Sequence, residues 1–382
     1  MTIPTNKTRT VLSDGRELIY FDDRPGIPRT APDLRNLAPH RPQSEIRYDP
    51  VLDDWVIVAA HRQTRTNLPA ASECPLCPTR GASLSEIPAD DYHVVTFENR
   101  FPSLGGAYEG RGDIAGGGVR GAPGGLADDG APSAAFQPIE PGVGRCEVVC
   151  FTSDHTSSFV RLSPERLHTV AAAWVDRTLH LSQVPGVEQV FIFENRGAEI
   201  GATLDHPHGQ IYGYPFVTSR TSRALASAAR WRDGHGSTSC LFCAIIADER
   251  EKRLRIVEET PSFIAFVPAA PRFPYELHVY PRRHVPDLPS LTAPELTELM
   301  SLQVDLLRRY ERLFDKPIPY MACWHQAPVR VGRDLSHLSL QLMSPQRAPN
   351  VLKFFASSES GMHAYTMDVL PETIAARFRD VK

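Results

Sequence analysis

The sequence has no run of about 20 apolar residues of the kind that a membrane-spanning helix requires. Its first residues, Met1 to Lys7, lack the apolar core of a signal peptide. There is also no basic excess, because 41 Lys and Arg stand against 45 Asp and Glu for a net charge of −4. A general nucleic-acid binder needs such an excess to neutralise phosphates. We therefore expect a soluble, cytoplasmic protein that binds neither membranes nor nucleic acid.

A disulfide framework is also missing, although the chain has seven cysteines. Four of them form two C-x-x-C pairs, Cys74/Cys77 and Cys240/Cys243. In a reducing compartment such pairs indicate metal or redox sites. Neither pair is expected to open a thioredoxin-like helix, and the first is bounded by prolines, which favours a metal site. The remaining cysteines lie in apolar, strand-like runs and are predicted to be buried thiols: Cys146, Cys150 and Cys323.

What the chain does have is a histidine motif at residues 205–211, D-H-P-H-G-Q-I. The preceding run 190–195 is apolar and β-prone, so the motif follows or lies on a buried strand. On a strand, His206, His208 and Gln210 would share one face. Two imidazoles at this spacing suit a metal site, a covalent phosphoryl carrier, or one of each. The alternative is a pair of hydrogen-bonded core histidines.

The 382 residues, 42% of them hydrophobic, suit two domains or one duplicated unit. Residues 1–45 are rich in proline and charge, and we predict an N-terminal arm. Residues 105–144 are glycine-rich and predict a mobile insertion, since few of their side chains could be buried. Other segments predict strands at 146–151 and 188–194, a helix at 164–181 opened by Ser163 and Pro164, a helix at 218–231 and a loop at 232–239.

The second part of the chain repeats this order. After Cys240 and Cys243 come a predicted strand at 275–280, a helix from Thr292 to about residue 313 and a strand at 320–325. The segment 337–342, H-L-S-L-Q-L, then matches 206–211 with serine in place of the second histidine. We infer a duplicated unit with halves at 46–217 and 218–382, the first catalytic; chance similarity of short segments is the alternative.

Cys74, Cys77, His155 and His206 make a Cys2His2 set, which suits tetrahedral zinc. With all four positions filled by protein, the zinc would be structural. By the duplication, a second zinc set is possible, formed by Cys240, Cys243, His284 and His337.

If zinc holds His206, His208 remains free, and a neutral imidazole is a good nucleophile near pH 7. Its attack on phosphorus would give a phosphoramidate. Gln210 could hydrogen-bond a phosphoryl oxygen or the imidazole. Three basic residues could balance phosphate charge, or could simply be solvated surface charges: Arg62, Arg65 and Lys353.

These segments resemble the galactose-1-phosphate uridylyltransferase family of the histidine-triad superfamily. The resemblance covers residues 45 to 370 and is carried by D-P at 49–50, W-V-I-V at 55–58, H-R-Q-T-R at 61–65, C-P-L-C at 74–77, F-E-N-R-F-P at 97–102, C-F-T-S-D-H at 150–155, F-E-N-R-G at 193–197, H-P-H-G-Q at 206–210 and W-H-Q-A-P at 324–328. It implies an α+β fold of two fused histidine-triad-like halves, with antiparallel sheets flanked by helices, and a homodimer.

The resemblance further implies a ping-pong exchange of UMP between UDP-glucose and galactose 1-phosphate, with His208 as nucleophile, oriented by the main-chain carbonyl of His206. Carried over by motif position, Asn99 and Asn195 would hold the nucleotide, and Thr203 and Gln210 the phosphates. The hexose phosphate would be held by Arg62, Arg65, Lys353 and Glu359.

The chain departs from the family at a second, iron-type metal site that some members have. His325 matches one of its ligands, but Ala224 stands at the glutamate position and Ser339 and Gln341 stand where histidines are usual. We expect this iron-type site to be absent. Two alternative functions remain: a related nucleotidyltransferase or nucleoside-diphosphate-sugar phosphorylase acting on another substrate, and a non-enzymatic, zinc-stabilised nucleotide-binding module.

Overall fold

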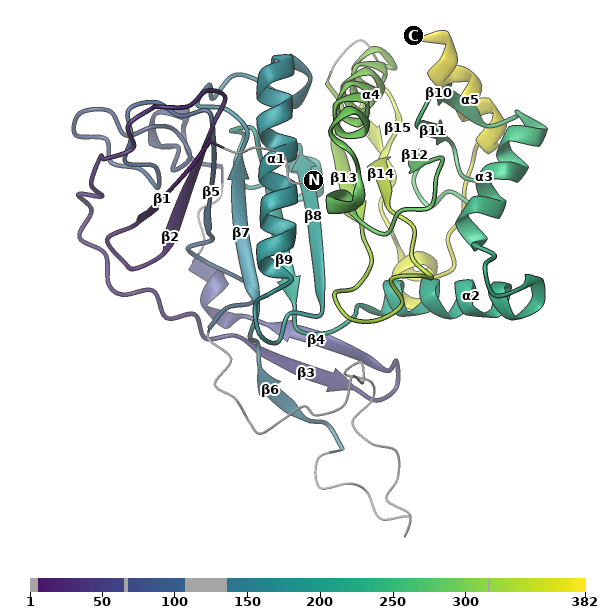
Figure 1. Ribbon diagram of the computed structural model, residues 1–382, viewed down its shortest axis with the longest axis horizontal. Helices are drawn as coiled ribbons and strands as arrows, with labels where there is room; N and C mark the ends of the chain where they lie inside the picture. Colours follow the sequence, from purple (N-terminus) through teal and green to yellow (C-terminus); the bar gives the residue numbers. More distant parts are fainter. Residues whose placement is uncertain (1–5, 65–67, 107–135, 315–316) are drawn as a thin grey trace.

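The protein is described here by a computed structural model covering residues 6–64, 68–106, 136–314 and 317–382. Its centre is one sheet of eleven strands in which every neighbouring pair is antiparallel (Figure 1). In spatial order the strands are β1 (Asn6–Val11), β2 (Glu17–Asp22), β5 (Val94–Glu98), β7 (Arg145–Cys150), β9 (His208–Tyr214), β8 (Gln189–Arg196), β13 (Tyr320–His325), β14 (Ser339–Ser344), β12 (Tyr275–Pro281), β11 (Phe263–Phe266) and β10 (Ile256–Glu259).

Smaller elements surround this sheet. A second sheet has the order β4 (Asp54–Val58), β3 (Glu45–Asp49) and β6 (Ile139–Pro141), and a two-stranded sheet pairs β15 (Gln346–Ala348) with β16 (Val351–Leu352). The α-helices are α1 (Pro164–Leu181), α2 (Ser219–His235), α3 (Leu241–Lys252), α4 (Ala293–Arg312) and α5 (Pro371–Asp380). None of the helices in the described ranges is both long enough and apolar enough to span a membrane.

The sheet consists of two similar halves that meet edge to edge, which confirms the predicted α+β fold of two fused halves. The first half has the order β5-β7-β9-β8, and the second has the matching order β11-β12-β14-β13 when read from its outer side. Strand β8 pairs with β13, from Ile192 opposite Trp324 to Arg196 opposite Tyr320. Helix α1 lies between β7 and β8, and α4 lies between β12 and β13 in the same position of the chain order. The duplicated order of elements is therefore present in space as well as in sequence.

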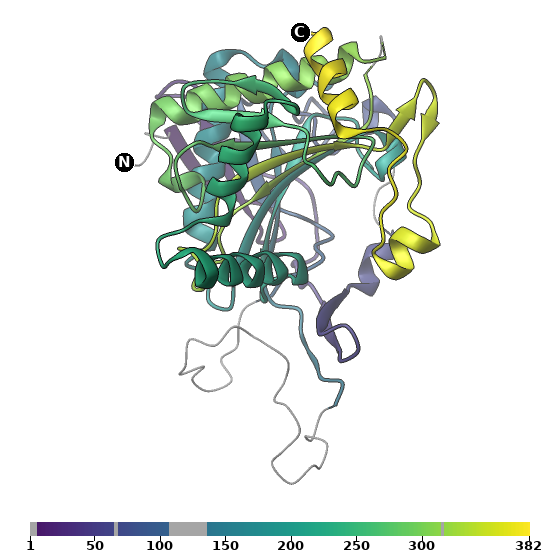
Figure 2. The same cartoon turned by 90° about the vertical axis from the view of Figure 1, so that its right-hand side faces the viewer.

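Local signals define the two matching helices as predicted. Ser163 caps α1 by accepting a hydrogen bond from the Arg166 amide, and Pro164 takes the first position. Thr292 and Glu295 form a reciprocal capping box at the start of α4. Both helices pack on the same face of the sheet and on each other (Figure 2), and the ring of Trp174 lies 5.8 Å from that of Trp324. One apolar core thus joins the two halves.

Alternation along the strands separates this core from the opposite face. In β8, Val190 and Ile192 are buried in the core shared with α1, whereas Phe191, Phe193 and Asn195 point the other way and are only partly buried. The second sheet lies on this other side, where Ile57 packs beside Tyr212 (Figure 2). In the second half, α3 also lies there, and its Phe242 packs against Tyr280. The face opposite α1 and α4 therefore remains available for polar side chains.

Three expectations need correction. The predicted arm is wrong in part, because β1 and β2 form an edge hairpin of the main sheet, in which residues 18–21 are buried. The helix at 218–231 continues to His235, which shortens the predicted loop. Cys240 is the N-cap residue of α3, so the second C-x-x-C pair does open a helix, built from strong helix formers such as Ala, Glu and Lys.

The predicted glycine-rich insertion is only partly visible. Residues 107–135 lie outside the described ranges. Of the remainder, Ile139–Pro141 pairs with β3 as an ordinary strand, because its neighbour β3 offers a free edge. The domain limits at residues 45 and 217 stay predictions.

Candidate active site and metal clusters

The two histidines of the central motif point in different directions. His208 is the first residue of β9, and it shares the partly buried face of that strand with Gln210 and Tyr212. His206 precedes the strand, so it does not share this face as a strand register would have required. Its side chain is buried, with 1% exposure, next to Cys77 and His155. The backbone turn between the two histidines thus assigns them to two different sites.

Gly209 is required by packing. A β-carbon at this position would lie 2.9 Å from the Phe151 ring and 2.9 Å from the Phe193 carbonyl oxygen. Real β-carbons do not approach other atoms so closely, so any larger residue would displace β9 from its neighbours β7 and β8. The glycine lets β9 sit close against both strands and fixes the position of the His208 side chain.

His208 is held by a main-chain oxygen. Its Nδ1 lies 2.7 Å from the carbonyl oxygen of His206. A carbonyl only accepts hydrogen bonds, so Nδ1 carries the proton and Nε2 keeps its lone pair. Burial lowers the pKa of His208, which favours the neutral ring. The imidazole is therefore oriented as a nucleophile with Nε2 free.

A cavity of about 240 Å³ lies against His208. The sequence-predicted residues that line it are Arg62, Asn99, Asn195, Thr203, His208 and Gln210. They come from separate segments: the 3-10 helix Ala60–Thr64, the end of β5, β8, the loop before β9, and β9 itself. Amide, hydroxyl and guanidinium groups are suited to bind the oxygens of a phosphate.

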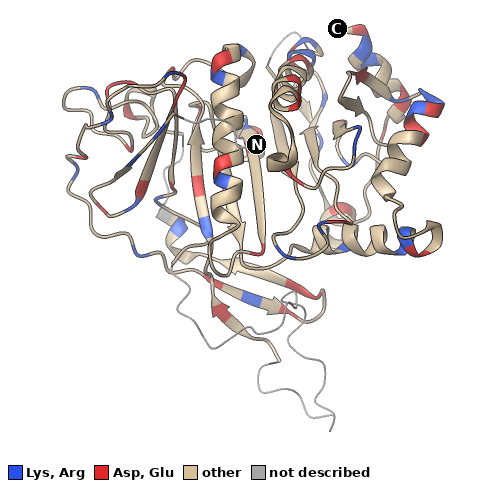
Figure 3. Ribbon diagram, in the orientation of Figure 1, with Lys and Arg blue, Asp and Glu red and all other residues tan. Residues whose placement is uncertain are grey.

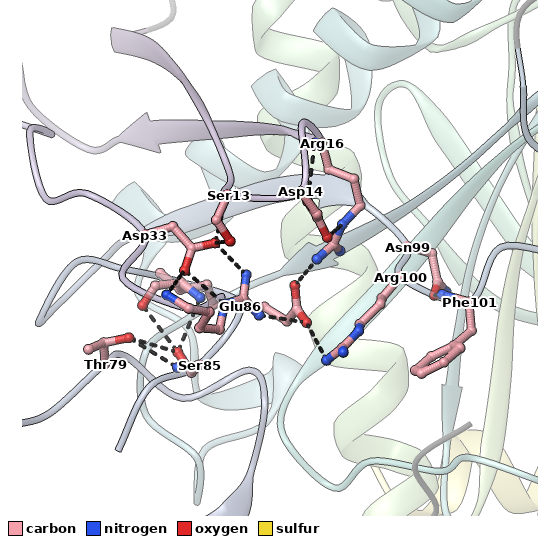
Figure 4. Close-up of polar contacts among 12 residues, drawn as sticks. Ser13, Asp14, Arg16, Asp33, Thr79, Ser85, Glu86, Asn99, Arg100 and Phe101 are labelled. Carbon is pink, nitrogen blue, oxygen red and sulfur yellow. Dashed lines mark hydrogen bonds and ion pairs between the residues drawn. The ribbon is translucent and has the colours of Figure 1, made fainter. Parts of the chain in front are cut away.

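The cavity wall includes residues that are not among the predicted site residues, such as Glu86, which lies outside the quoted motifs, and Arg100, which lies within F-E-N-R-F-P. Glu86 is buried and belongs to an ion-pair network (Figure 4). Its carboxylate lies 2.6 Å from Arg16, which is 1% exposed, and 2.8 Å from Arg35. Arg16 also donates to the carbonyl oxygen of Glu98 at 2.9 Å, directly before Asn99. The N-terminal hairpin thus supports the pocket, a role that the expected arm would not have had.

Two of the sequence-predicted residues that the structure describes are not among those that line this cavity. Lys353 and Glu359 form an ion pair of 3.4 Å with each other on the segment after β16, and neither lines the pocket. Arg65 lies outside the described residues.

The first Cys2His2 set is assembled as predicted. The candidate ligand atoms of Cys74, Cys77, His155 and His206 all lie within 4.8 Å of one another. The Cys77 sulfur is 3.5 Å from Nδ1 of His155 and 3.6 Å from Nδ1 of His206. Tetrahedral zinc with ordinary Zn–S and Zn–N bonds would place such atoms about 3.5 Å apart. Nε2 of His206 lies 2.8 Å from the Thr152 carbonyl oxygen, which leaves Nδ1 as the free ligand. The residues fit zinc.

The second set is assembled in the same way, from Cys240, Cys243, His284 and His337. The Cys240 sulfur lies 3.2 Å from Nδ1 of His284 and 3.8 Å from Nδ1 of His337. Nε2 of His337 is 2.9 Å from the carbonyl oxygen of Pro281, which repeats the bond that His206 makes to Thr152. Both clusters could therefore hold a metal ion with the same support from the sheet.

At the position of the iron-type site, His325 has other partners. Its Nε2 lies 3.1 Å from the side-chain oxygen of Gln341, and its Nδ1 lies 3.0 Å from the Arg220 guanidinium. Ala224 and Ser339 line the same region without offering a carboxylate or an imidazole. The absence of an iron-type site stays a prediction.

An oriented imidazole beside a pocket of amide, hydroxyl and guanidinium groups is the arrangement that nucleotidyl transfer through a histidine would require, and the chain is a nucleotidyltransferase. Residues 35–218 match the profile of the galactose-1-phosphate uridyl transferase N-terminal domain, and residues 226–381 match that of its C-terminal domain. The chain therefore belongs to the galactose-1-phosphate uridylyltransferase family.

Individual relatives agree with this assignment. The chain is 42% identical to galactose-1-phosphate uridylyltransferase of Streptomyces lividans, over 98% of both proteins. It is 37% identical to the enzyme of the same name from Thermotoga maritima, over 88% of this chain and 98% of the relative. Among solved structures, a uridylyltransferase superposes with a TM-score of 0.72 at 28% identity, covering 88% of this chain and 98% of that one.

Proposed function

We propose that the protein transfers UMP between UDP-glucose and galactose 1-phosphate by a ping-pong mechanism, with His208 as the covalent carrier. The observation that carries this proposal is the oriented imidazole of His208 inside the pocket that Asn99, Asn195, Thr203 and Gln210 line. Family membership supports the choice of substrates, since the relatives are named for this reaction.

In the first step, Nε2 of His208 attacks the α-phosphorus of UDP-glucose. The N–P bond forms while the bond from that phosphorus to the bridging oxygen breaks, and glucose 1-phosphate leaves with the electron pair. In the second step, a phosphate oxygen of galactose 1-phosphate attacks the same phosphorus and releases the imidazole. The uridylyl-imidazole is cationic, and the His206 carbonyl oxygen at 2.7 Å stabilises its Nδ1–H. Gln210 and Thr203 would bind the phosphoryl oxygens from the pocket wall.

Zinc would have a structural role in this enzyme, with Cys74, Cys77, His155 and His206 as its ligands. When bound, it fixes the loop that bears His206, and through the His206 carbonyl it fixes the ring of His208. The second set, Cys240 with Cys243, His284 and His337, would hold a second zinc that ties the start of α3 to β14.

We further propose a cytoplasmic homodimer. Lys353 and Glu359 do not line the pocket of their own chain, so a role in holding the hexose phosphate would be played in the pocket of a second copy. Exposed apolar side chains on the same segment suit such an interface, with Phe354 75% and Met362 78% exposed. All seven cysteines are free, as expected in a reducing compartment.

The direct test is incubation with UDP-glucose labelled in the α-phosphate, followed by denaturation and measurement of acid-labile label on the protein. Wild type should retain label, and His208→Ala should retain none. His168→Ala, which changes an exposed histidine on α1, is the matched control and should label normally. Label on the His208→Ala protein would refute the assignment of the nucleophile, and an unlabelled wild type would refute uridylylation from this donor.

Metal analysis tests the zinc proposals. Wild type purified without chelators should contain two zinc ions per chain. Cys77→Ser and Cys243→Ser should each lose one, and Cys323→Ser, which lies outside both clusters, should lose none. A wild type without zinc would overturn both assignments.

A further inference from the structure

A second and larger cavity, of about 810 Å³, lies in the second half, on the face of the sheet opposite α1 and α4. Its floor comes from alternate residues of three strands: Glu276 and His278 of β12, Cys323 and His325 of β13, and Ser339 and Gln341 of β14. Phe191 of β8 also lines it, and this ring stacks on Phe193, which lines the His208 pocket, with centroids 5.1 Å apart. The two cavities are therefore neighbours on one face, separated by an aromatic wall.

The cavity occupies the place in the second half that the His208 pocket occupies in the first. His206 and His337 make the same hydrogen bond, to a main-chain carbonyl at or just after the end of the neighbouring strand. Counting two residues onward places Ser339 at the position of His208, and four onward places Gln341 at that of Gln210. Both line the cavity. The second half thus keeps a pocket at the equivalent position, with a serine in place of the imidazole at the position of His208.

The walls of this cavity are basic. Helix α2 has four arginines and a single aspartate, and blue segments mark basic positions along its ribbon (Figure 3). Two of these arginines, Arg220 and Arg223, line the cavity together with Arg272. Within the described residues, none of the three forms an ion pair. The nearby carboxylate of Glu276 is engaged already, by His278 at 2.7 Å and by the backbone amide of Arg272 at 2.6 Å. Three guanidinium groups stand against two carboxylates, Asp54 and Glu276, in the lining of the cavity. The excess of positive charge favours an anionic ligand.

Aromatic rings form one end of the cavity. The ring of Phe355 lies 4.7 Å from that of Phe273 and 5.3 Å from that of Tyr365, measured between centroids. The Arg272 guanidinium lies over the Tyr365 ring at 5.0 Å. Such a cluster offers faces on which a planar base can stack.

We propose that this cavity binds a nucleoside phosphate and does not react with it. The arginines would hold the phosphate and the aromatic cluster would hold the base. No bond would be made or broken, because Ser339 replaces the nucleophile. The volume is within the range of about 300 to 1,000 Å³ that is typical of small-ligand sites.

The test is equilibrium dialysis of the full-length, metal-loaded protein with UMP. Wild type should bind two UMP per chain. The double variant Arg223→Glu/Arg272→Glu should bind one UMP, with the affinity of the second cavity for UMP lowered at least about tenfold. Both side chains are exposed, so the fold should tolerate the change, and Arg223→Lys/Arg272→Lys is the matched control that should retain two. A wild type that binds one UMP, or a charge-reversed variant that still binds two, would overturn the proposal.

Two further probes identify the ligand class. Inorganic phosphate and galactose 1-phosphate should each bind to the second cavity more weakly than UMP does, since neither has a base to stack. Equal affinity for inorganic phosphate would contradict a nucleoside site. Because binding stoichiometry does not depend on label transfer to His208, this proposal and the proposed reaction can fail separately.

Discussion

Glu194 makes the stability of the fold depend on pH, because its carboxyl group is buried where the two halves meet. It lies on β8 opposite Ala322 of β13 and is 6% exposed. Tyr320 donates a hydrogen bond of 2.9 Å to one oxygen, and the other oxygen has no protein partner among the described residues. Burial raises the pKa of Glu194 from 4.5 to about 7. The folded protein therefore holds this proton over a pH range in which the unfolded chain has released it.

The sign of the pH effect follows from this difference. The contribution of Glu194 to stability is fully present below pH 4.5 and is lost as pH rises through about 7, since the folded state binds more protons in between. At about 1.4 kcal/mol for each pKa unit, the full effect is about 3 kcal/mol. Between about pH 5.5 and about pH 8 the expected loss is about 2 kcal/mol.

Glu194→Gln should remove this loss, because an amide keeps an acceptor for Tyr320 and does not ionise. Urea unfolding at both pH values gives the free energies, and the comparison of variant with wild type cancels the other titrating groups. Glu199→Gln, at an exposed position in the following loop, is the matched control and should behave as wild type. If Glu194→Gln lost as much stability as wild type over this range, the reasoning on Glu194 would be wrong.

Three other substitutions test the packing around the site. Gly209→Ala should destabilise the fold by about 1–3 kcal/mol and reduce labelling with UDP-glucose, because the new methyl group meets the Phe151 ring; a variant with unchanged stability and labelling would argue against this contact. Arg177→Met should cost about 3–5 kcal/mol in urea unfolding, because buried Glu147 would lose its partner at 2.7 Å and keep only Arg145 at 3.1 Å, and Arg177→Met combined with Glu147→Gln should recover part of that loss. Thr292→Ala should cost about 1 kcal/mol through the lost cap of α4 with no change in labelling, whereas Thr292→Ser should be nearly neutral.

The features that could be predicted from sequence are those encoded by nearby residues. Ser163 and Thr292 predict the starts of α1 and α4, and the C-x-x-C pairs predict both candidate metal clusters. The N-terminal hairpin was missed because its stability comes from pairing β2 with β5, about 75 residues away in the chain, and the proline-rich stretch after it dominated the composition.

The residues of the pocket wall show the same difference between features encoded by nearby residues and features that depend on distant ones. Motifs identified Asn99, Asn195 and Gln210, and the fold brings them together. Glu86 could not be found this way, because its importance depends on Arg16, which is distant in sequence and becomes fully buried only in the folded chain. Position alone likewise gave no sign that Lys353 would lie away from the pocket of its own chain.

The pairing of β8 with β13 also limits how this protein can move. Five registered residue pairs join the halves into one continuous sheet, so neither half can hinge against the other without breaking main-chain hydrogen bonds. Closure of one half onto the other is therefore not available as a way to cover His208. The pairing of β8 with β13 also gives the second half a structural role. Without that half, β8 would become an exposed edge, and β8 is the strand that holds Asn195 and Phe193 in the pocket wall.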